Sequence, residues 1–196
     1  MPDTRTPSPV ESSTPAAIVR AARAVATSPV VLIDGPSGAG KSRLADAVVA
    51  AWPGTGVQLV RMDDLYPGWE GLSAASDLVR DALLEPLRAT GTARWRGWDW
   101  AASRPGSWHH VVGGHPLIVE GCGCLTPDSA RLADLRVWLD ADDEVRKRRA
   151  LARDKGGFDE YWDLWQGQWE AHLLRSTPRM LADLLLDGSA ELPVGR

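Results

Sequence analysis

The segment from Val30 to Ala45, VVLIDGPSGAGKSRLA, constrains the fold more than any other part of the chain. Its first four residues are apolar and predict a buried strand, and the sequence from Lys41 onward is typical of a helix. Between them, GPSGAGKS at residues 35–42 fits the pattern G-x-x-x-x-G-K-[S/T]. Glycines let the backbone bend so that amide N–H groups point at phosphate oxygens beside the helix N-terminus. The segment therefore predicts a strand–loop–helix unit that binds a nucleoside triphosphate.

Individual positions of this phosphate loop have expected roles. Lys41 would reach the β- and γ-phosphates, and the Ser42 hydroxyl would bind Mg²⁺. The expected nucleotide-binding residues are Gly35, Ser37, Gly38, Ala39, Gly40, Lys41, Ser42 and Arg43. The alternative is a glycine turn that merely begins a helix. The loop alone does not separate kinases from GTPase switches, motors or transporters. The chain lacks the Asn-Lys-x-Asp sequence that reads guanine in GTPases, which disfavours a switch protein.

The rest of the chain alternates short apolar runs with longer helical patterns. The runs predict five strands, at Val30–Ile33, Val57–Val60, Leu117–Val119, Val137–Leu139 and Leu184–Leu186. Their apolarity is continuous, which fits a parallel sheet covered on both faces. A helix is expected to begin at Thr14. The pattern predicts a doubly wound α/β domain with a mainly parallel sheet.

Length and composition narrow the domain organisation and the class of partner. The 196 residues suit one domain, which we place at residues 15–196 after a disordered tail over residues 1–14 that is rich in Pro, Ser and Thr. The net charge of -4 disfavours nucleic acid and anionic membranes as partners. The absence of a long apolar run or a signal peptide predicts a cytoplasmic protein. Cys122 and Cys124 are expected to be free thiols.

Carboxylates follow two of the predicted strands. Asp63 and Asp64 come after the second strand, and Glu120 closes the third. Because ligands of open α/β sheets bind at the carboxyl ends of the strands, these side chains are expected near the phosphate loop. They could accept a proton from an attacking hydroxyl or hold the water shell of Mg²⁺. A solvated acidic turn or a helix cap is the alternative for the aspartates.

Arginines recur in the predicted helix after the fourth strand. Arg146, Arg149 and Arg153 are three and four residues apart and so share one helical face, from which Lys147 and Arg148 point away. Cations on a mobile helix can stabilise a transferring phosphoryl group and exclude water. The alternative is a solvated face that pairs with the acidic residues at the start of the same helix.

The chain holds ten tryptophans and a single phenylalanine. We expect a pocket role for Trp98, with Trp100 as the next candidate, because rigid rings can stack on a flat ligand. Packing is expected for Trp52, Trp138, Trp162, Trp165 and Trp169. His109 and His110 are expected to lie in a loop without a functional role.

In the order of these motifs the chain resembles the uridine–cytidine kinases and related P-loop nucleoside kinases. GPSGAGKS resembles their nucleotide loop, Asp-Asp-Leu-Tyr at residues 63–66 their Asp-Ser-Phe-Tyr segment, and IVEG their strand that ends in glutamate. WDWAASR at residues 98–104 is similar to their Tyr-Asp-Phe-x-x-x-x-Arg segment, one residue shorter, and LDADDEVRKRRALARD to their lid helix. The resemblance spans residues 30–188. It implies a P-loop NTPase three-layer sandwich with a mainly parallel five-stranded sheet and a helical lid.

The resemblance also implies a reaction, in which ATP and Mg²⁺ phosphorylate a hydroxyl of a small-molecule acceptor, a nucleoside first. The implied catalytic residues are Asp63 as general base, with Lys41, Arg149 and Arg153 on the phosphates. Ser42 and Glu120 would serve the metal. The implied substrate contacts are Asp63, Tyr66, Trp98, Asp99, Arg104 and Glu120.

One departure leaves the acceptor open. Ala74 stands where uridine kinases carry an aspartate that grips the ribose hydroxyls. A nucleoside monophosphate kinase, for which Arg94, Arg96 and Arg104 would supply charge, and a kinase of another small alcohol are therefore alternatives. A regulatory nucleotide-binding NTPase is the alternative from another class.

Overall fold

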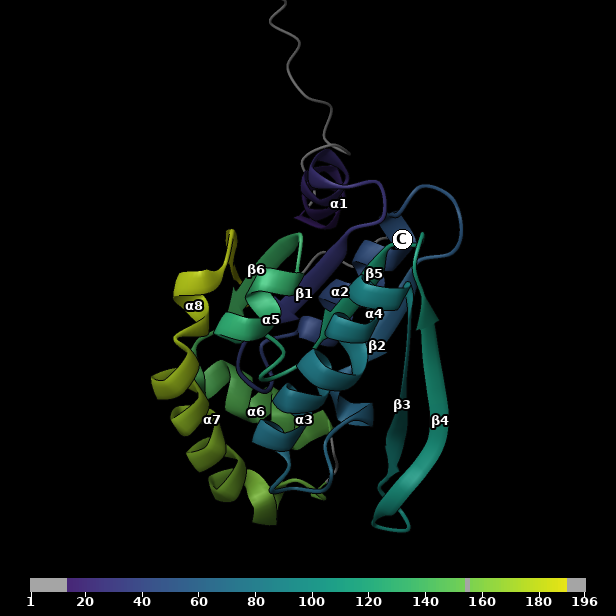
Figure 1. Ribbon diagram of the computed structural model, residues 1–196. Helices are drawn as coiled ribbons and strands as arrows, with labels where there is room; N and C mark the ends of the chain where they lie inside the picture. The colour runs from purple at the N-terminus through teal and green to yellow at the C-terminus, as the bar shows by residue number, and fades with distance from the viewer. Residues whose placement is uncertain (1–13, 154–155, 190–196) are drawn as a thin grey trace, which may run out of the picture.

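A five-stranded parallel sheet forms the centre of the molecule in the computed structural model, which describes residues 14–153 and 156–189 (Figure 1). Its strands are β1 (Val30–Asp34), β2 (Gln58–Arg61), β5 (Leu117–Glu120), β6 (Leu135–Asp140) and β7 (Leu184–Asp187). They follow the order β2-β5-β1-β6-β7 and all pair in parallel. The five predicted strands are confirmed with small shifts at their ends. The predicted tail lies outside the described residues except for Thr14, which begins the first helix.

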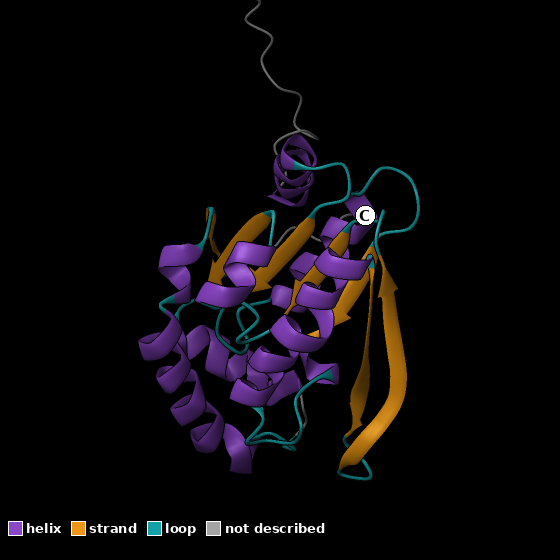
Figure 2. Cartoon of the chain, in the orientation of Figure 1, coloured by secondary structure: helices purple, strands orange, loops and turns teal. Residues whose placement is uncertain are grey.

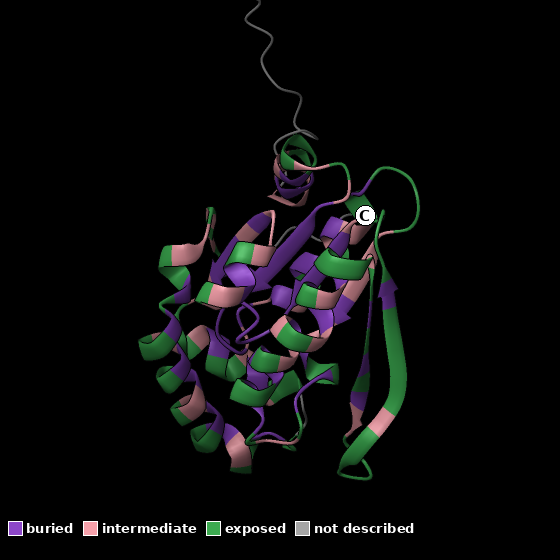
Figure 3. Ribbon diagram, in the orientation of Figure 1, coloured by how far each residue is buried: buried purple, intermediate pink, exposed green. Residues whose placement is uncertain are grey.

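Helices cover both faces of this sheet (Figure 2). They are α1 (Thr14–Val25), α2 (Lys41–Ala51), α3 (Leu72–Leu78), α4 (Glu85–Thr90), α5 (Pro127–Leu132), α6 (Asp143–Arg153), α7 (Trp162–Ser176) and α8 (Pro178–Leu181), with a π-helical stretch at Val79–Leu84 between α3 and α4. In β1, Val31 and Ile33 pack with α1 and α2, whereas Val30 and Leu32 face α3, α4 and α7. Because successive strand side chains alternate between faces, β1 is buried from end to end and the three-layer prediction is confirmed (Figure 3). No helix in the described ranges is long and apolar enough to cross a membrane.

An antiparallel hairpin beside the sheet was not predicted. It consists of β3 (Thr92–Asp99) and β4 (Arg104–Val112) (Figure 1). His109 and His110 lie in β4, so the prediction of a loop there was wrong. Burial alternates along β3, but the inward positions include Ala93 and Gly97, whose small side chains hide the period of two.

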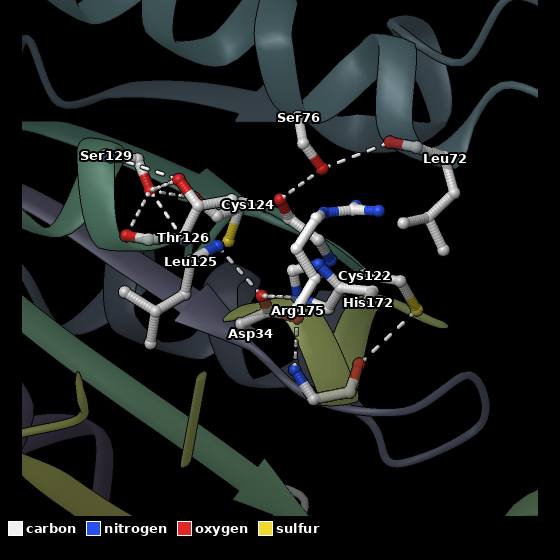
Figure 4. A network of polar contacts seen from close by, with 12 residues as sticks. Asp34, Leu72, Ser76, Cys122, Cys124, Leu125, Thr126, Ser129, His172 and Arg175 are labelled. Carbon is white, nitrogen blue, oxygen red and sulfur yellow. Dashed lines mark hydrogen bonds and ion pairs between the residues drawn. The ribbon is translucent and has the colours of Figure 1, made fainter. Parts of the chain in front are cut away.

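The end of β1 is fixed by a buried carboxylate (Figure 4). Asp34 is fully buried, and its Oδ1 accepts hydrogen bonds from the backbone N–H groups of Gly35, at 2.7 Å, and Gly123, at 3.0 Å. Its Oδ2 accepts one from the Leu125 N–H at 2.8 Å. These charge-assisted bonds offset the cost of removing the carboxylate from water. Asp34 therefore ties the start of the phosphate loop to the turn that follows β5.

Replacing this carboxylate should destabilise the whole fold. Asp34→Ala leaves three buried N–H groups without an acceptor, and we expect the free energy of unfolding to fall by roughly 3 kcal/mol or more, at about 1–3 kcal/mol for each group. Urea denaturation followed by circular dichroism measures this change. The exposed carboxylate of Glu170 on α7 provides the control, since Glu170→Gln should change stability by less than about 0.5 kcal/mol. Equal stability of the two variants would contradict the role given to Asp34.

Candidate functional site

The phosphate loop joins β1 to α2 and depends on left-handed glycines. Gly38 has a φ of 82° and Gly40, the residue before α2, has a φ of 100°. A Cβ atom on Gly38 would clash with the backbone carbonyl oxygen of Arg146, so the backbone of α6 packs directly on the loop. In the part of the chain that the structure describes, no side chain caps the N-terminus of α2. Its amide groups remain available to an anion.

Lys41 begins α2 and is almost completely buried. Its Nζ donates to the carbonyl oxygen of Pro36 at 2.9 Å and to the Sγ of Cys122 at 3.3 Å. Burial, the largest influence, lowers the pKa of Lys41, but Cys122, Glu120 and Asp34 together raise it above its ordinary value. The ammonium group is therefore charged at neutral pH and is held at the loop.

Glu120 ends β5 and is only 3% exposed. Burial, the largest influence, and the nearby charge of Asp63 raise the pKa of Glu120, while the charges of Lys41 and Arg61 and a hydrogen bond with Ser42 act in the opposite direction. The Nη1 of Arg61 donates to its Oε1 at 3.1 Å, and the other end of the guanidinium pairs with Asp46 at 2.6 Å. Arg61 was not predicted, although its position at the end of β2, in register with Glu120, is the signal for this contact.

A cavity of about 780 Å³ extends from the phosphate loop. This volume lies in the range of small-molecule sites. The predicted residues that line it are Ser37, Gly38, Gly40, Lys41, Ser42, Arg43, Asp63, Tyr66, Glu120, Arg149 and Arg153. Asp63 lies in a 3₁₀ turn, Met62–Asp64, at the carboxyl end of β2, and its neighbour Asp64 does not line the cavity. The structure thus brings the loop, both predicted carboxylates and two arginines of α6 around one space.

Other predicted residues lie elsewhere. Trp98, Asp99 and Arg104 sit at the far end of the hairpin and are not among the residues that line this cavity. Gly35 and Ala39 belong to the loop but do not line the cavity either. The three hairpin residues had been expected from motif order, which does not determine where the tip of a hairpin points, whereas Gly35 and Ala39 had been expected from the phosphate-loop pattern.

The arginines of α6 do not all face the site. Arg149 and Arg153 line the cavity, but Arg146 is buried and bonds to Asp143 at 2.6 Å and to Gln166 at 3.0 Å. Arg146 therefore pairs with an acidic residue at the start of its helix, as the alternative expected, but it is buried and not solvated. The guanidinium of Arg149 donates to the carbonyl oxygens of Gly188 and Ser189, at 2.6 and 2.9 Å.

Aromatic side chains also line the cavity, and we call them the aromatic wall: Tyr66, Trp69, Trp100, Phe158 and Trp165. The Tyr66 hydroxyl donates to the Cys122 carbonyl at 2.8 Å, and burial raises the pKa of Tyr66 well above its ordinary value. The Trp100 Nε1 donates to the backbone carbonyl of Asp63 at 2.8 Å. Trp69 and Phe158 were not predicted, and Trp165 was expected only to pack.

The remaining tryptophans and the cysteines behave as predicted. Trp52, Trp138, Trp162 and Trp169 are buried, which confirms their packing role. Cys122 and Cys124 are free and buried, and Cys122 also lines the cavity.

Comparisons with known proteins agree with this architecture. A "possible uridine kinase" from Bacillus stearothermophilus superposes with a TM-score of 0.63 and 18% identity, covering 88% of this chain and 97% of that one. A "putative fructose transport system kinase" from Silicibacter sp. TM1040 superposes with a TM-score of 0.61 and 20% identity, covering 88% and 98%. No curated protein matches the chain. A family model described as AAA domain matches residues 31–161, well over half of the sequence. The chain is therefore a member of this family of P-loop domains, and it has the fold of the P-loop kinases.

Proposed function

We propose that this protein is an ATP-dependent kinase that transfers the γ-phosphoryl group to a hydroxyl of a small molecule, with a nucleoside as the first candidate. One observation carries the proposal. The Asp63 carboxylate shares a cavity with the phosphate loop, and the aromatic wall lines the same cavity. A triphosphate bound at the loop would therefore leave a second, differently lined region beside Asp63 for an acceptor. A protein that only binds and hydrolyses a nucleotide has no need of that region.

The chemistry proposed for the chain's own residues is positioning and charge neutralisation. Asp63 would accept the proton of the attacking hydroxyl, and the buried ammonium of Lys41 would neutralise charge on the phosphate oxygens. Arg153 would act from α6. Arg149 would reach the phosphates only by exchanging its two bonds to the Gly188 and Ser189 carbonyl groups.

The donor set also fits a Mg²⁺ ion. Ser42 supplies a hydroxyl in the first turn of α2, and Glu120 supplies a carboxylate in the same cavity, and both are oxygen ligands of the kind that Mg²⁺ prefers. Magnesium, when bound with ATP, neutralises charge on the phosphates. We propose that Ser42 binds the ion and that Glu120 orients its water shell.

The alternatives receive less support. In a nucleoside monophosphate kinase, Arg94, Arg96 and Arg104 would have to face the acceptor, but none of them lines the cavity. Arg94 and Arg96 instead lie against the ring of Trp108 on the hairpin. A regulatory NTPase would leave the aromatic wall unexplained. We retain a cytoplasmic location, a single domain over residues 15–196 and the absence of nucleic-acid or membrane partners as parts of the proposal.

Asp63 and Asp64 provide a matched pair for testing the base. Asp63→Asn should lower acceptor-dependent turnover at least about a hundredfold, because an amide cannot take up the proton. Binding of ATP, measured by calorimetry, should be retained. Asp64→Asn, which changes the neighbouring carboxylate outside the cavity, should leave turnover within about threefold of the unaltered protein, a change worth under 1 kcal/mol. Unaltered turnover in Asp63→Asn would remove this residue from its role.

The proposed role of Glu120 can be tested by measuring how turnover depends on the Mg²⁺ concentration. Glu120→Gln should raise the Mg²⁺ concentration needed for half-maximal turnover by about tenfold to a hundredfold, as for other residues that orient metal ligands. The affinity for ADP in the absence of Mg²⁺ should change little. Glu70→Gln alters an exposed carboxylate outside the cavity and serves as the control. An unchanged Mg²⁺ requirement in Glu120→Gln would show that this carboxylate does not serve the metal.

A further inference from the structure

On the basis of the proposed function, we infer that the acceptor is recognised through a flat ring and not through the hydroxyl groups of a sugar. The predicted substrates are ring-bearing alcohols, among which ribonucleosides and 2′-deoxyribonucleosides are used alike, while free sugars are not. Three observations on the acceptor side of the cavity support this inference.

Two of the four polar side-chain atoms of the aromatic wall are already hydrogen-bonded within the protein. The Tyr66 hydroxyl is bonded to the Cys122 carbonyl, and the Trp100 Nε1 is bonded to the Asp63 carbonyl, each at 2.8 Å. The Trp165 Nε1 is buried without a hydrogen-bond partner. Tyr66, Trp100 and Trp165 therefore offer a ligand the apolar surfaces of their rings. A sugar hydroxyl placed against them would lose its hydrogen bonds to water without replacement, which is costly.

The rings are held in place before a ligand arrives. The Trp69 centroid lies 4.9 Å from that of Trp100 and 5.3 Å from that of Phe158, and Tyr66 meets Trp165 edge-on at 4.8 Å. Gln168 on α7 reinforces this arrangement, because its Nε2 donates to the Trp69 carbonyl at 2.7 Å and its Oε1 accepts from the Leu72 N–H at 3.2 Å. A preformed aromatic surface of this kind favours a flat, rigid ligand.

The described lining of the cavity offers few carboxylates that could bind a diol. Among residues 14–153 and 156–189 two carboxylates line the cavity, and Glu120 is paired with Arg61 and lies toward Ser42, which leaves Asp63 for the reacting hydroxyl. Ala74, the position at which the sequence comparison located a missing diol contact, is exposed on α3 and does not line the cavity, so the described lining itself carries this part of the inference. A site that hydrogen-bonds a hydroxyl rejects the analogue lacking it by about 10⁴-fold or more, whereas an apolar surface discriminates far less.

A panel of paired acceptors tests the inference. The values of kcat/KM would be measured for the four common ribonucleosides, their 2′-deoxy counterparts, ribose and fructose, with product identified by mass spectrometry. The ribo and deoxy forms of the best base should agree within about tenfold, and both should exceed the sugars by more than about a hundredfold. A loss of about a thousandfold or more on removing the 2′-hydroxyl, or a sugar as the best acceptor, would overturn the inference and leave the kinase proposal intact. Failure of every acceptor to yield a phosphorylated product would contradict the proposed function itself.

Variants of Trp100 test whether the aromatic wall binds the ring of the acceptor. Trp100→Leu should raise the KM for the best acceptor about tenfold and leave the KM for ATP unchanged, because a ring contact is lost on the acceptor side only. Trp100→Phe keeps a ring but removes the bond from Nε1 to the Asp63 carbonyl, and should stay within about threefold of the unaltered KM. Trp108→Leu, at an exposed tryptophan outside the cavity, is the control and should change neither constant. An effect of Trp100→Phe as large as that of Trp100→Leu would assign Trp100 to positioning Asp63 and would overturn its role in ring binding.

Discussion

The buried carboxylate of Asp34 is the interaction on which the rest of the site depends. It bonds to backbone N–H groups on two sides, those of Gly35 in the phosphate loop and those of Gly123 and Leu125 in the turn after β5. That turn contains Cys122, whose sulfur accepts from Lys41 and whose carbonyl accepts from Tyr66. One carboxylate thus fixes the relative positions of the loop lysine and a residue of the aromatic wall. Without its three donors a buried charge at this point would be strongly destabilising.

The cavity has two kinds of lining. One kind is polar and charged and consists of Lys41, Ser42 and Arg43 at the start of α2 with Arg149 and Arg153 of α6, which in the proposed reaction would neutralise phosphate charge. The other kind is the aromatic wall, whose Trp100 bonds to the Asp63 carbonyl and which in the proposed reaction would exclude water and orient the acceptor. Helix α6 is linked to both kinds of lining. Its backbone lies against Gly38 of the phosphate loop, and Phe158, which follows α6 in the chain, stacks on the Trp69 ring of the aromatic wall. A displacement of α6 would therefore shift residues of both the phosphate loop and the aromatic wall.

Much of the fold was predictable because its signals are local. The apolar runs of β1, β2 and β5–β7 and the GPSGAGKS loop each depend on a few adjacent residues, and the rule that ligands bind at the carboxyl ends of strands placed Asp63 and Glu120 correctly. The hairpin was not predicted, because its inward positions include Ala93 and Gly97, which are too small to give the alternating apolar pattern of a strand. Of the aromatic wall, Tyr66 and Trp100 were predicted to lie at a pocket, but Trp69 and Phe158 were not, because they come from segments that only the tertiary fold brings together with these two. Helical spacing correctly predicted that Trp165 is buried, but periodicity cannot distinguish a side chain that faces the core from one that also borders a cavity.

The fate of the γ-phosphoryl group tests the central claim most directly. The protein would be incubated with Mg²⁺-ATP and a ribonucleoside, and phosphorus-31 spectra would be recorded as ADP accumulates. We expect a phosphate monoester of the acceptor to appear in equal amount to ADP, and little ADP to form when the acceptor is omitted. Inorganic phosphate as the sole new product, formed at the same rate with and without any alcohol, would contradict it.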